Sequence, residues 1–264
     1  PGRHRPGRRD QLPPLAQTVM KKDMVITREE TLGPFDPDNT KGTYSAAIPD
    51  AWCYEAGQAS FGDLLAWFIN AFPRSGNVKD DFAYYDRAAA LRSPGAGHLL
   101  ALDWWNGCRV PFGDSTLSGL LVGMNMRTTA VDIYRALMES ICFGARTIVD
   151  LLASSGSPIE RVVLTGGLAQ KNDVLMQMLA DILGCALEIP RLTHPTAIGA
   201  AIHGAVAAGV VTDYSDGAGR FGATDYRIVE PTTGVFPIYD ERYRRYREMS
   251  DNSSVRNVMH ALNK

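Results

Sequence analysis

Hydrophobic positions recur at helical spacing in several stretches of the chain. Residues 61–72 repeat apolar side chains three or four positions apart and are followed by a proline, which predicts a helix. Residues 130–152 carry the longest stripe of this kind. Residues 239–249 form a shorter, arginine-rich pattern that we expect to be an exposed helix. A helix over residues 84–91 and a strand over residues 98–102 complete this part of the pattern.

Strand and helix patterns alternate over residues 161–210. An apolar run at 162–164 precedes a helical stripe formed by Leu175, Met178, Leu179 and Ile182. A second apolar run covers residues 186–189, and a helix of small residues is expected over residues 197–208. Strands that alternate with helices are typical of α/β folds, so we expect an α/β domain.

A glycine pair, Gly166-Gly167, occupies the turn between the first of these strands and the helix that follows. Glycine lets the backbone approach a ligand closely, and the amides at the start of the next helix can then face that ligand. This arrangement favours a nucleotide-binding turn. The alternative is that the two glycines serve only a tight turn, which short motifs of this kind often do.

The first 44 residues differ in composition from the rest. Residues 1–14 are rich in Arg, Pro and Gly and have no apolar period, and turn-forming dipeptides follow over residues 23–41. We expect residues 1–44 to be disordered or loosely attached, and residues 45–264 to form one domain. A basic arm could contact nucleic acid, but a solvated tail is the simpler interpretation.

Composition excludes several classes of function. Hydrophobic residues make up 45% and charged residues 21% of the chain, as in ordinary globular proteins. A formal net charge of −2 gives no reason to expect a nucleic-acid partner, and no apolar run approaches a membrane span. The four cysteines show no metal-binding spacing, so we expect free thiols in a reduced cytoplasm (Cys53, Cys108, Cys142 and Cys185).

Five separate segments resemble the FGGY family of carbohydrate kinases, in the expected order. They are Tyr54–Gln58 with the following Gly62–Phe68, Ala101–Gly107, Gly119–Glu139, the glycine-turn block at 161–210, and Tyr239–Met249. The similarity covers roughly Ala46 to Met249 and is greatest to the bacterial L-ribulokinases. It implies an actin-like ATPase fold, which is ribonuclease H-like, and specifically the C-terminal half of a sugar kinase.

The resemblance also implies a reaction and its ligands. In the family, a sugar hydroxyl attacks the γ-phosphate of ATP with the help of Mg²⁺ and a carboxylate that accepts the hydroxyl proton. By resemblance, Gly166 and Gly167 place their backbone against adenosine, Lys171 and Asn172 line the base and ribose, and Glu55 contacts sugar hydroxyls. Alternatively, Lys171 and Asn172 are a solvated helix start with Asn172 as its N-cap, and Glu55 is a surface acid.

Parts of the family pattern have no counterpart in this chain. No DxGT-type phosphate loop and no convincing catalytic Asp occur in the sequence, and Gly42-Thr43 is weak evidence for a phosphate turn. We therefore assign no catalytic residue and no metal ligand, and we expect a separate or missing N-terminal kinase domain. A non-catalytic module that binds nucleotide, sugar or another protein is the alternative function.

Other chemistry-bearing residues are expected to be structural. We expect Trp104 and Trp105 to be core residues rather than a sugar-stacking pair. Asp103 and Asp114 are expected to be hydrogen-bonding acids, and His203 to be packed or half-exposed on its helix. His194 stands where ribulokinases usually carry an acidic residue, so a polar ligand contact from this loop is in doubt.

Overall fold

The computed structural model describes residues 25–27, 42–45, 47–49, 51–154 and 159–263. The expectation that residues 1–44 are disordered or loosely attached therefore falls mostly outside the described residues, at 1–24 and 28–41. The helices are α1 (Gly62–Ala71), α2 (Val78–Ala90), α3 (Ala130–Ser154), α4 (Gly167–Lys171), α5 (Asp173–Leu183), α6 (Pro195–Ala207), α7 (Tyr214–Phe221), α8 (Phe236–Ser250) and α9 (Ser253–Leu262). The strands are β1 (Val25–Thr27), β2 (Gly42–Tyr44), β3 (Trp52–Tyr54), β4 (Leu100–Leu102), β5 (Leu120–Val122), β6 (Val162–Val163), β7 (Leu187–Pro190) and β8 (Tyr226–Val229).

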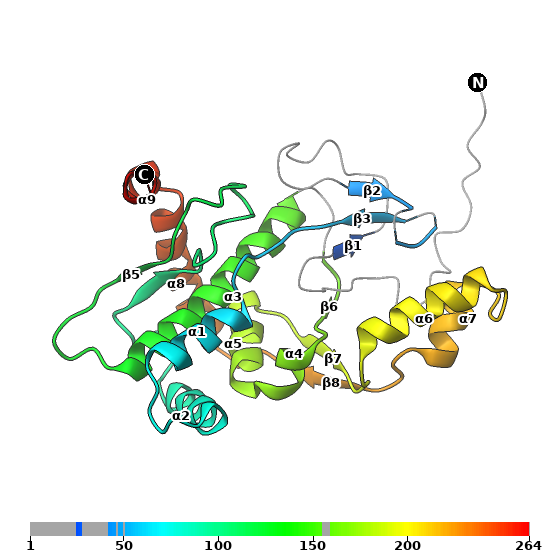
Figure 1. Ribbon diagram of the computed structural model, residues 1–264, viewed down its shortest axis with the longest axis horizontal. Coiled ribbons are helices and arrows are strands. Elements are labelled where there is room, and N and C mark those ends of the chain that lie inside the picture. The colour runs from blue at the N-terminus through cyan, green and yellow to red at the C-terminus, as the bar shows by residue number, and fades with distance from the viewer. Residues whose placement is uncertain (1–24, 28–41, 46, 50, 155–158, 264) are drawn as a thin grey trace.

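Helix α3 runs through the middle of the molecule (Figure 1). From Tyr134 to Ala145 every residue is buried, including polar ones. A helix that is buried on all sides needs neighbours all round. Helices α1, α2, α5 and α8 and strand β4 all pack against it. The helix predicted at residues 130–152 is thus confirmed, and it is the element on which the core is built.

Strands β6, β7 and β8 form one sheet, and the glycine turn follows β6. β6 pairs with β7 in parallel, with Val162 opposite Leu187, and β8 pairs with β7 in the antiparallel sense. Helix α5 connects β6 to β7 and buries the predicted apolar face. Gly184 ends α5 at a φ of 68°, in the left-handed region that glycine tolerates best.

Two smaller sheets complete the strand pairing. β4 and β5 form an antiparallel pair. β3 lies between β1 and β2 and is antiparallel to both. Gly42 and Thr43 lie in β2, opposite Tyr54 and Cys53, so the dipeptide is part of a strand and not of a turn.

Four helices were missed or misjudged from the pattern. α2 begins at Val78, six residues before the predicted start, because Asn77 caps it by accepting hydrogen bonds from the amides of Lys79 and Asp80. α7 and α9, whose N-caps are Asp213 and Asn252, were not predicted. α8 is not simply exposed as expected. Its tyrosines at 239, 243 and 246 are buried against the core, whereas Arg244 and Arg245 are exposed.

The cysteine expectation is confirmed in part. All four cysteines are free thiols. Cys142 is fully buried in α3, as expected of a small core residue, whereas Cys185 is only half-buried. No helix among the described residues is both long and apolar enough to cross a membrane.

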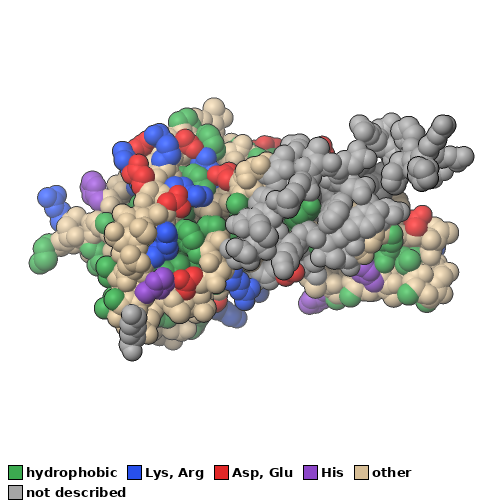
Figure 2. All heavy atoms as spheres, turned by 90° about the horizontal axis from the view of Figure 1, so that it is seen from above, with side chains coloured by type: hydrophobic (Ala, Val, Ile, Leu, Met, Phe, Trp, Pro, Cys, Tyr) green, Lys and Arg blue, Asp and Glu red, His purple; other side chains and the backbone are tan. Residues whose placement is uncertain are grey.

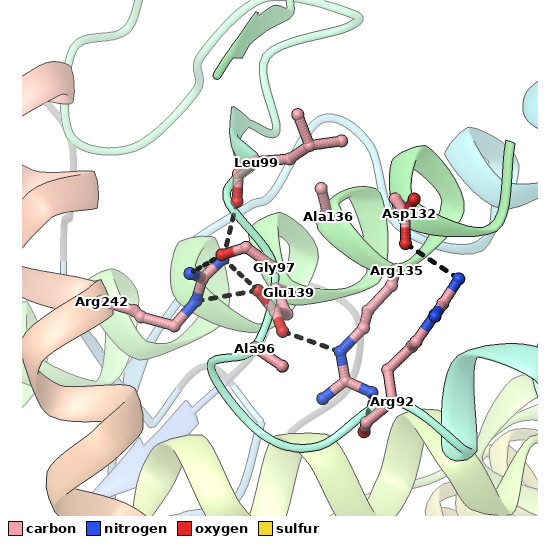
Figure 3. A pocket seen from close by; sticks show the side chains of 9 residues that line it. All are labelled: Arg92, Ala96, Gly97, Leu99, Asp132, Arg135, Ala136, Glu139 and Arg242. Carbon is pink, nitrogen blue, oxygen red and sulfur yellow. Dashed lines mark hydrogen bonds and ion pairs between the residues drawn. The ribbon is translucent and has the colours of Figure 1, made fainter. Parts of the chain in front are cut away.

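A buried ion network joins α3 to α8. Glu139 is 3% exposed and accepts from Arg135 Nε at 3.1 Å and from Arg242 Nη2 at 2.7 Å. Figure 3 shows both guanidinium groups beside this one carboxylate. The arginines also donate to backbone carbonyl oxygens. Arg135 donates to Ala89 in the last turn of α2 and to Arg92 just after it, and Arg242 donates to Leu99. The network therefore holds the loop after α2 as well as the two helices.

Replacing this carboxylate should destabilise the fold strongly. Glu139→Leu leaves Arg135 and Arg242 buried without an anion, which costs about 3–5 kcal/mol in comparable buried pairs. We expect a loss of that size in the free energy of unfolding measured with urea. Glu248→Leu, at an exposed ion pair with Arg245, is the matched control and should change it by under about 1 kcal/mol. Equal losses in the two variants would contradict the role assigned to Glu139.

Candidate functional site

The Gly166-Gly167 turn faces open space. Gly166 follows β6 and is the N-cap of α4, Gly167 is the first residue of α4, and both glycines are exposed. Gly166 has a φ of 103°, a conformation that residues with a side chain rarely adopt. A Cβ at either glycine would meet no other atom within 4 Å. The turn therefore leaves room for a ligand against its backbone.

Contacts from the sheet hold α4 behind this turn. Gln170 Nε2 donates to the carbonyl oxygen of Pro190 at 2.8 Å. Arg227, on β8, donates to the carbonyl oxygen of Ala169 at 2.8 Å and pairs with Asp173 at 2.9 Å. The turn is thus mounted on β7 and β8, so its backbone direction is set by the sheet.

The two polar residues predicted beside the turn differ in their surroundings. Lys171 is exposed at the end of α4. Asn172 is only 5% exposed, and its side-chain oxygen accepts from the amide of Leu175, so its role as the N-cap of α5 is confirmed. Its side-chain amide nitrogen, Nδ2, donates to Asp86 Oδ1 at 3.1 Å. Little of Asn172 is left for a ligand, and a direct contact with nucleotide stays a prediction.

Asp86 was not found by sequence reasoning. Its Oδ1 atom accepts from Tyr134 at 2.7 Å as well as from Asn172. Burial raises the pKa of Asp86, while these two hydrogen bonds oppose that rise. A single acid within a polar helix carries no sequence signal for such a role, because its partners lie 48 and 86 residues away.

Glu55 lies in a second segment, directly after β3. Its side chain is exposed, which a contact with sugar hydroxyls requires. Burial raises the pKa of the Cys53 thiol, and the negative charge of Glu55 raises it further. Gln58, three residues further on, donates to Asp103 Oδ2 at 2.6 Å and to the carbonyl oxygen of Ile141. The loop that carries Glu55 is therefore anchored in the core.

Asp103 is the buried acid of this anchor. It is 5% exposed, and its other oxygen accepts from the hydroxyl of Tyr246 at 2.7 Å. A Cβ at Gly144 of α3 would collide with the Asp103 carboxylate, so only glycine fits there. The expectation that Asp103 is a hydrogen-bonding structural acid is confirmed.

The remaining candidates have structural surroundings. Trp104 is 3% exposed, as expected of a core residue, whereas Trp105 is half-buried and lies 5.8 Å from Trp67 between ring centroids. Asp114 bonds to Thr116 and His260. His194 precedes α6 at a φ of 55° without a side-chain cap bond, and exposed His203 contacts the hydroxyl of Tyr214.

Two further features of the described part of the chain add no candidate site residue. No group of three or more His, Cys, Asp or Glu side chains is placed there to hold a metal ion. The pocket of Figure 3 is lined by the ion network, and none of the predicted site residues borders it. On the face shown in Figure 2, acidic and basic side chains are interspersed over the part coloured by type.

Residues 21–208 match the model of the C-terminal domain of the FGGY family of carbohydrate kinases. The chain belongs to this family. The match begins ahead of residue 45, so the family similarity extends further toward the N-terminus than the five segments indicated. The position of the domain boundary stays a prediction.

Curated relatives narrow the similarity to one kind of kinase. The chain is 38% identical over 218 residues to the ribulokinase of Mycolicibacterium smegmatis, which covers 80% of this chain and 38% of that protein. It is 36% identical over 216 residues to the ribulokinase of Anoxybacillus flavithermus, covering 77% of this chain and 38% of that protein. The chain thus spans about two fifths of the length of these relatives.

Solved structures show the same fold at lower identity. The xylulose kinase of Rhodospirillum rubrum matches 92% of this chain and 47% of its own with a TM-score of 0.75 and 22% identity. The glycerol kinase of Plasmodium falciparum, solved with ADP, matches 90% of this chain and 46% of its own with a TM-score of 0.67 and 19% identity. The expected actin-like α/β fold of this FGGY domain is confirmed.

Asp103 should make the stability of this FGGY domain depend on pH. Burial raises its pKa to about 6, so between about pH 4 and pH 6 the folded chain retains a proton that the unfolded chain has released. The contribution of Asp103 to stability is therefore greatest below pH 4 and declines by about 3 kcal/mol as the pH rises to 6.

Asp103→Asn removes this titration. Urea unfolding of the parent and the variant at pH 4, 5, 6 and 7 measures the difference in unfolding free energy. We expect that difference, parent minus variant, to fall across the window from pH 4 to 6 and then to level off. A difference that stays constant with pH would show that Asp103 does not carry the raised pKa.

Proposed function

We propose that this chain forms the C-terminal half of an ATP-dependent ribulokinase, which transfers the γ-phosphate of ATP to L-ribulose and yields L-ribulose 5-phosphate. The observation that carries the proposal is the 38% identity to a ribulokinase over 218 residues. The substrates are assigned by this similarity, and another ketopentose or a polyol would fit the same reaction. The other half of the kinase would come from a separate or missing N-terminal domain.

The open glycine turn supports an adenosine seat in this half. Phosphoryl transfer depends on positioning and on charge stabilisation more than on covalent help from the protein. We assign the backbone of Gly166 and Gly167 to the adenosine, because a Cβ there would stand in the space that the turn leaves open. Lys171 is exposed beside the turn and would contact the base or ribose, while Asn172 would hold the start of α5 under it.

Glu55 would serve the sugar. A carboxylate can accept hydrogen bonds from two hydroxyl groups, which suits a polyol, and this one is exposed on an anchored loop. No group of three or more His, Cys, Asp or Glu side chains among the described residues could hold a metal ion, and we assign no metal ligand and no proton acceptor to them.

Gly167→Val tests the adenosine seat. The new side chain would fill the space over the turn, and because Gly167 has no positive φ and no neighbour within 4 Å, the fold should survive. We expect ADP binding by the 264-residue chain, followed by NMR titration, to be lost while the circular dichroism spectrum is unchanged.

Gly219→Val is the matched control for this variant. Gly219 lies in α7, also with open space around its Cβ position, and no residue assigned to the seat lies on that helix. It should bind ADP as the parent does. Identical chemical-shift changes in the parent and in Gly167→Val would remove the turn from the nucleotide site, and an unfolded variant would favour a purely structural turn.

The 264-residue chain alone should not phosphorylate L-ribulose. It contains no DxGT-type motif and no assigned proton acceptor, and loss of the orientation of both reactants forfeits much of the roughly 7–11 kcal/mol that positioning can supply. A coupled assay for ADP release with L-ribulose measures this. Turnover near 1–100 per second, roughly the range of kinases, would contradict the expectation.

A further inference from the structure

Asp86 is the point at which two helices meet the start of a third. It lies on α2, and its Oδ1 atom accepts from the hydroxyl of Tyr134 of α3 at 2.7 Å and from the side-chain amide of Asn172 at 3.1 Å. Both distances are typical of hydrogen bonds. Tyr134 is fully buried, so its hydroxyl has no water to replace this bond. The bond from Tyr134 therefore fixes the carboxylate from the α3 side, and the same oxygen, Oδ1, accepts from Asn172.

Asn172 is the joint between α4 and α5. Its amide donates to the carbonyl oxygen of Leu168 at 3.0 Å, and its own carbonyl oxygen accepts from Met176 at 3.1 Å. Its side-chain oxygen accepts from the amide of Leu175 at 2.9 Å. These three bonds set the angle between the two helices. The fourth polar group, the side-chain amide, is the one that reaches Asp86.

Hydrogen bonds attach α4 to two different parts of the fold, the sheet and the pair of helices α2 and α3. Gln170 and Arg227 tie α4 to the sheet through the carbonyl oxygens of Pro190 and Ala169. Among the described side-chain hydrogen bonds, the one from Asn172 to Asp86 ties the α4–α5 joint to α2 and α3. Leu168 and Ala169 also pack α4 against the apolar core, and we expect the loss of this bond to let α4 turn on the sheet, together with the glycine turn at its first residue.

We propose that Asp86 is a positioning residue for the adenine nucleotide. It acts through Asn172 to hold α4, and with it the backbone of Gly166 and Gly167, in the orientation that receives the nucleotide. Asp86 itself does not contact the ligand. The inference rests on the proposed function for the identity of the ligand, but the restraint on the joint does not depend on it.

The chain offers a closely matched control in Asp103. Like Asp86, Asp103 accepts from a buried tyrosine hydroxyl and from a side-chain amide, here those of Tyr246 and Gln58. Its partners lie on α8 and on the loop after β3, not on α4 or α5. Asp86→Ala and Asp103→Ala thus remove the same chemistry from two places, and only the first removes the tie to the joint.

Two measurements on the 264-residue chain test the proposal. Native-state hydrogen exchange without ligand follows the amides of Asn172 and Leu175, which are bonded at the joint. NMR titration with ADP follows affinity. We expect Asp86→Ala to speed both exchange rates by more than its loss of unfolding free energy accounts for, and to weaken ADP binding by tenfold or more. Asp103→Ala should change ADP affinity by less than twofold and speed exchange only as far as its own loss of unfolding free energy accounts for.

An exchange of partners keeps the test decisive if Asp86→Ala does not fold. Asn172→Asp retains an oxygen for the Leu175 amide but removes the donor to Asp86. The double variant Asp86→Asn/Asn172→Asp restores one donor and one acceptor with their places reversed. We expect the single variant to behave as Asp86→Ala does, and the double variant to recover most of the parent's exchange protection and ADP affinity.

The outcomes separate this inference from the proposed function. Unchanged exchange in Asp86→Ala and Asn172→Asp, or equal effects of Asp86→Ala and Asp103→Ala, would overturn the positioning role. A parent chain that does not bind ADP would overturn the nucleotide assignment, and the exchange rates would still decide whether Asp86 restrains the joint. Faster exchange with unaltered ADP affinity would show that the joint does not position the nucleotide.

Discussion

A helix that is buried on every side must find a partner for each polar group that it carries, and α3 carries several. Tyr134 finds Asp86 of α2, Glu139 finds Arg242 of α8, and Thr147 lies within hydrogen-bond distance of Tyr243, also on α8. A buried polar group without a partner costs about 1–3 kcal/mol, so these pairings leave little freedom in how the neighbours are placed. The apolar surface of α3 drives assembly, and its polar groups select the arrangement.

The same constraint explains which glycine matters to the core. At Gly144 the Asp103 carboxylate and the Gln58 amide come so close to α3 that any side chain would collide with them. The glycines of the candidate site are different, since nothing lies near the Cβ positions of Gly166 and Gly167. One glycine is required by packing, and the other two keep space open. Their sequence contexts alone do not distinguish these roles.

Local patterns predicted the elements whose cause is local. The stripe of Leu175, Leu179 and Ile182 buries as its spacing indicated, and the long helix at 130–152 is the core helix. Helix α8 was misjudged because seven of its fifteen residues are Arg, Asp or Glu, which hides the tyrosine face that packs inward. Helix α2 was predicted too short because Asn77 and Asp81, rather than apolar spacing, start it.

The residues of the candidate site likewise differ in whether the sequence alone reveals them. Gly166 and Gly167 stand out in the sequence because an unusual backbone needs an unusual residue. Asp86, Gln58 and Tyr246 do not, because each becomes meaningful only through partners far along the chain. Family resemblance supplied roles for exposed residues such as Lys171 and Glu55, and it carried no information about the buried groups beneath them.

Asp86 and Asp103 show how one chemical device can have two consequences. Each is a carboxylate that joins a tyrosine hydroxyl to a side-chain amide, and burial raises the pKa of both. What differs is how the element that carries the amide is attached to the rest of the fold. Gln58 also donates to the carbonyl oxygen of Ile141 on α3, so its loop stays attached to the core when the bond to Asp103 is lost. Asn172 carries a five-residue helix whose other hydrogen bonds come from the sheet. We therefore expect loss of the bonds at Asp103 to lower the free energy of unfolding, and loss of the bond at Asp86 to change the orientation of the glycine turn.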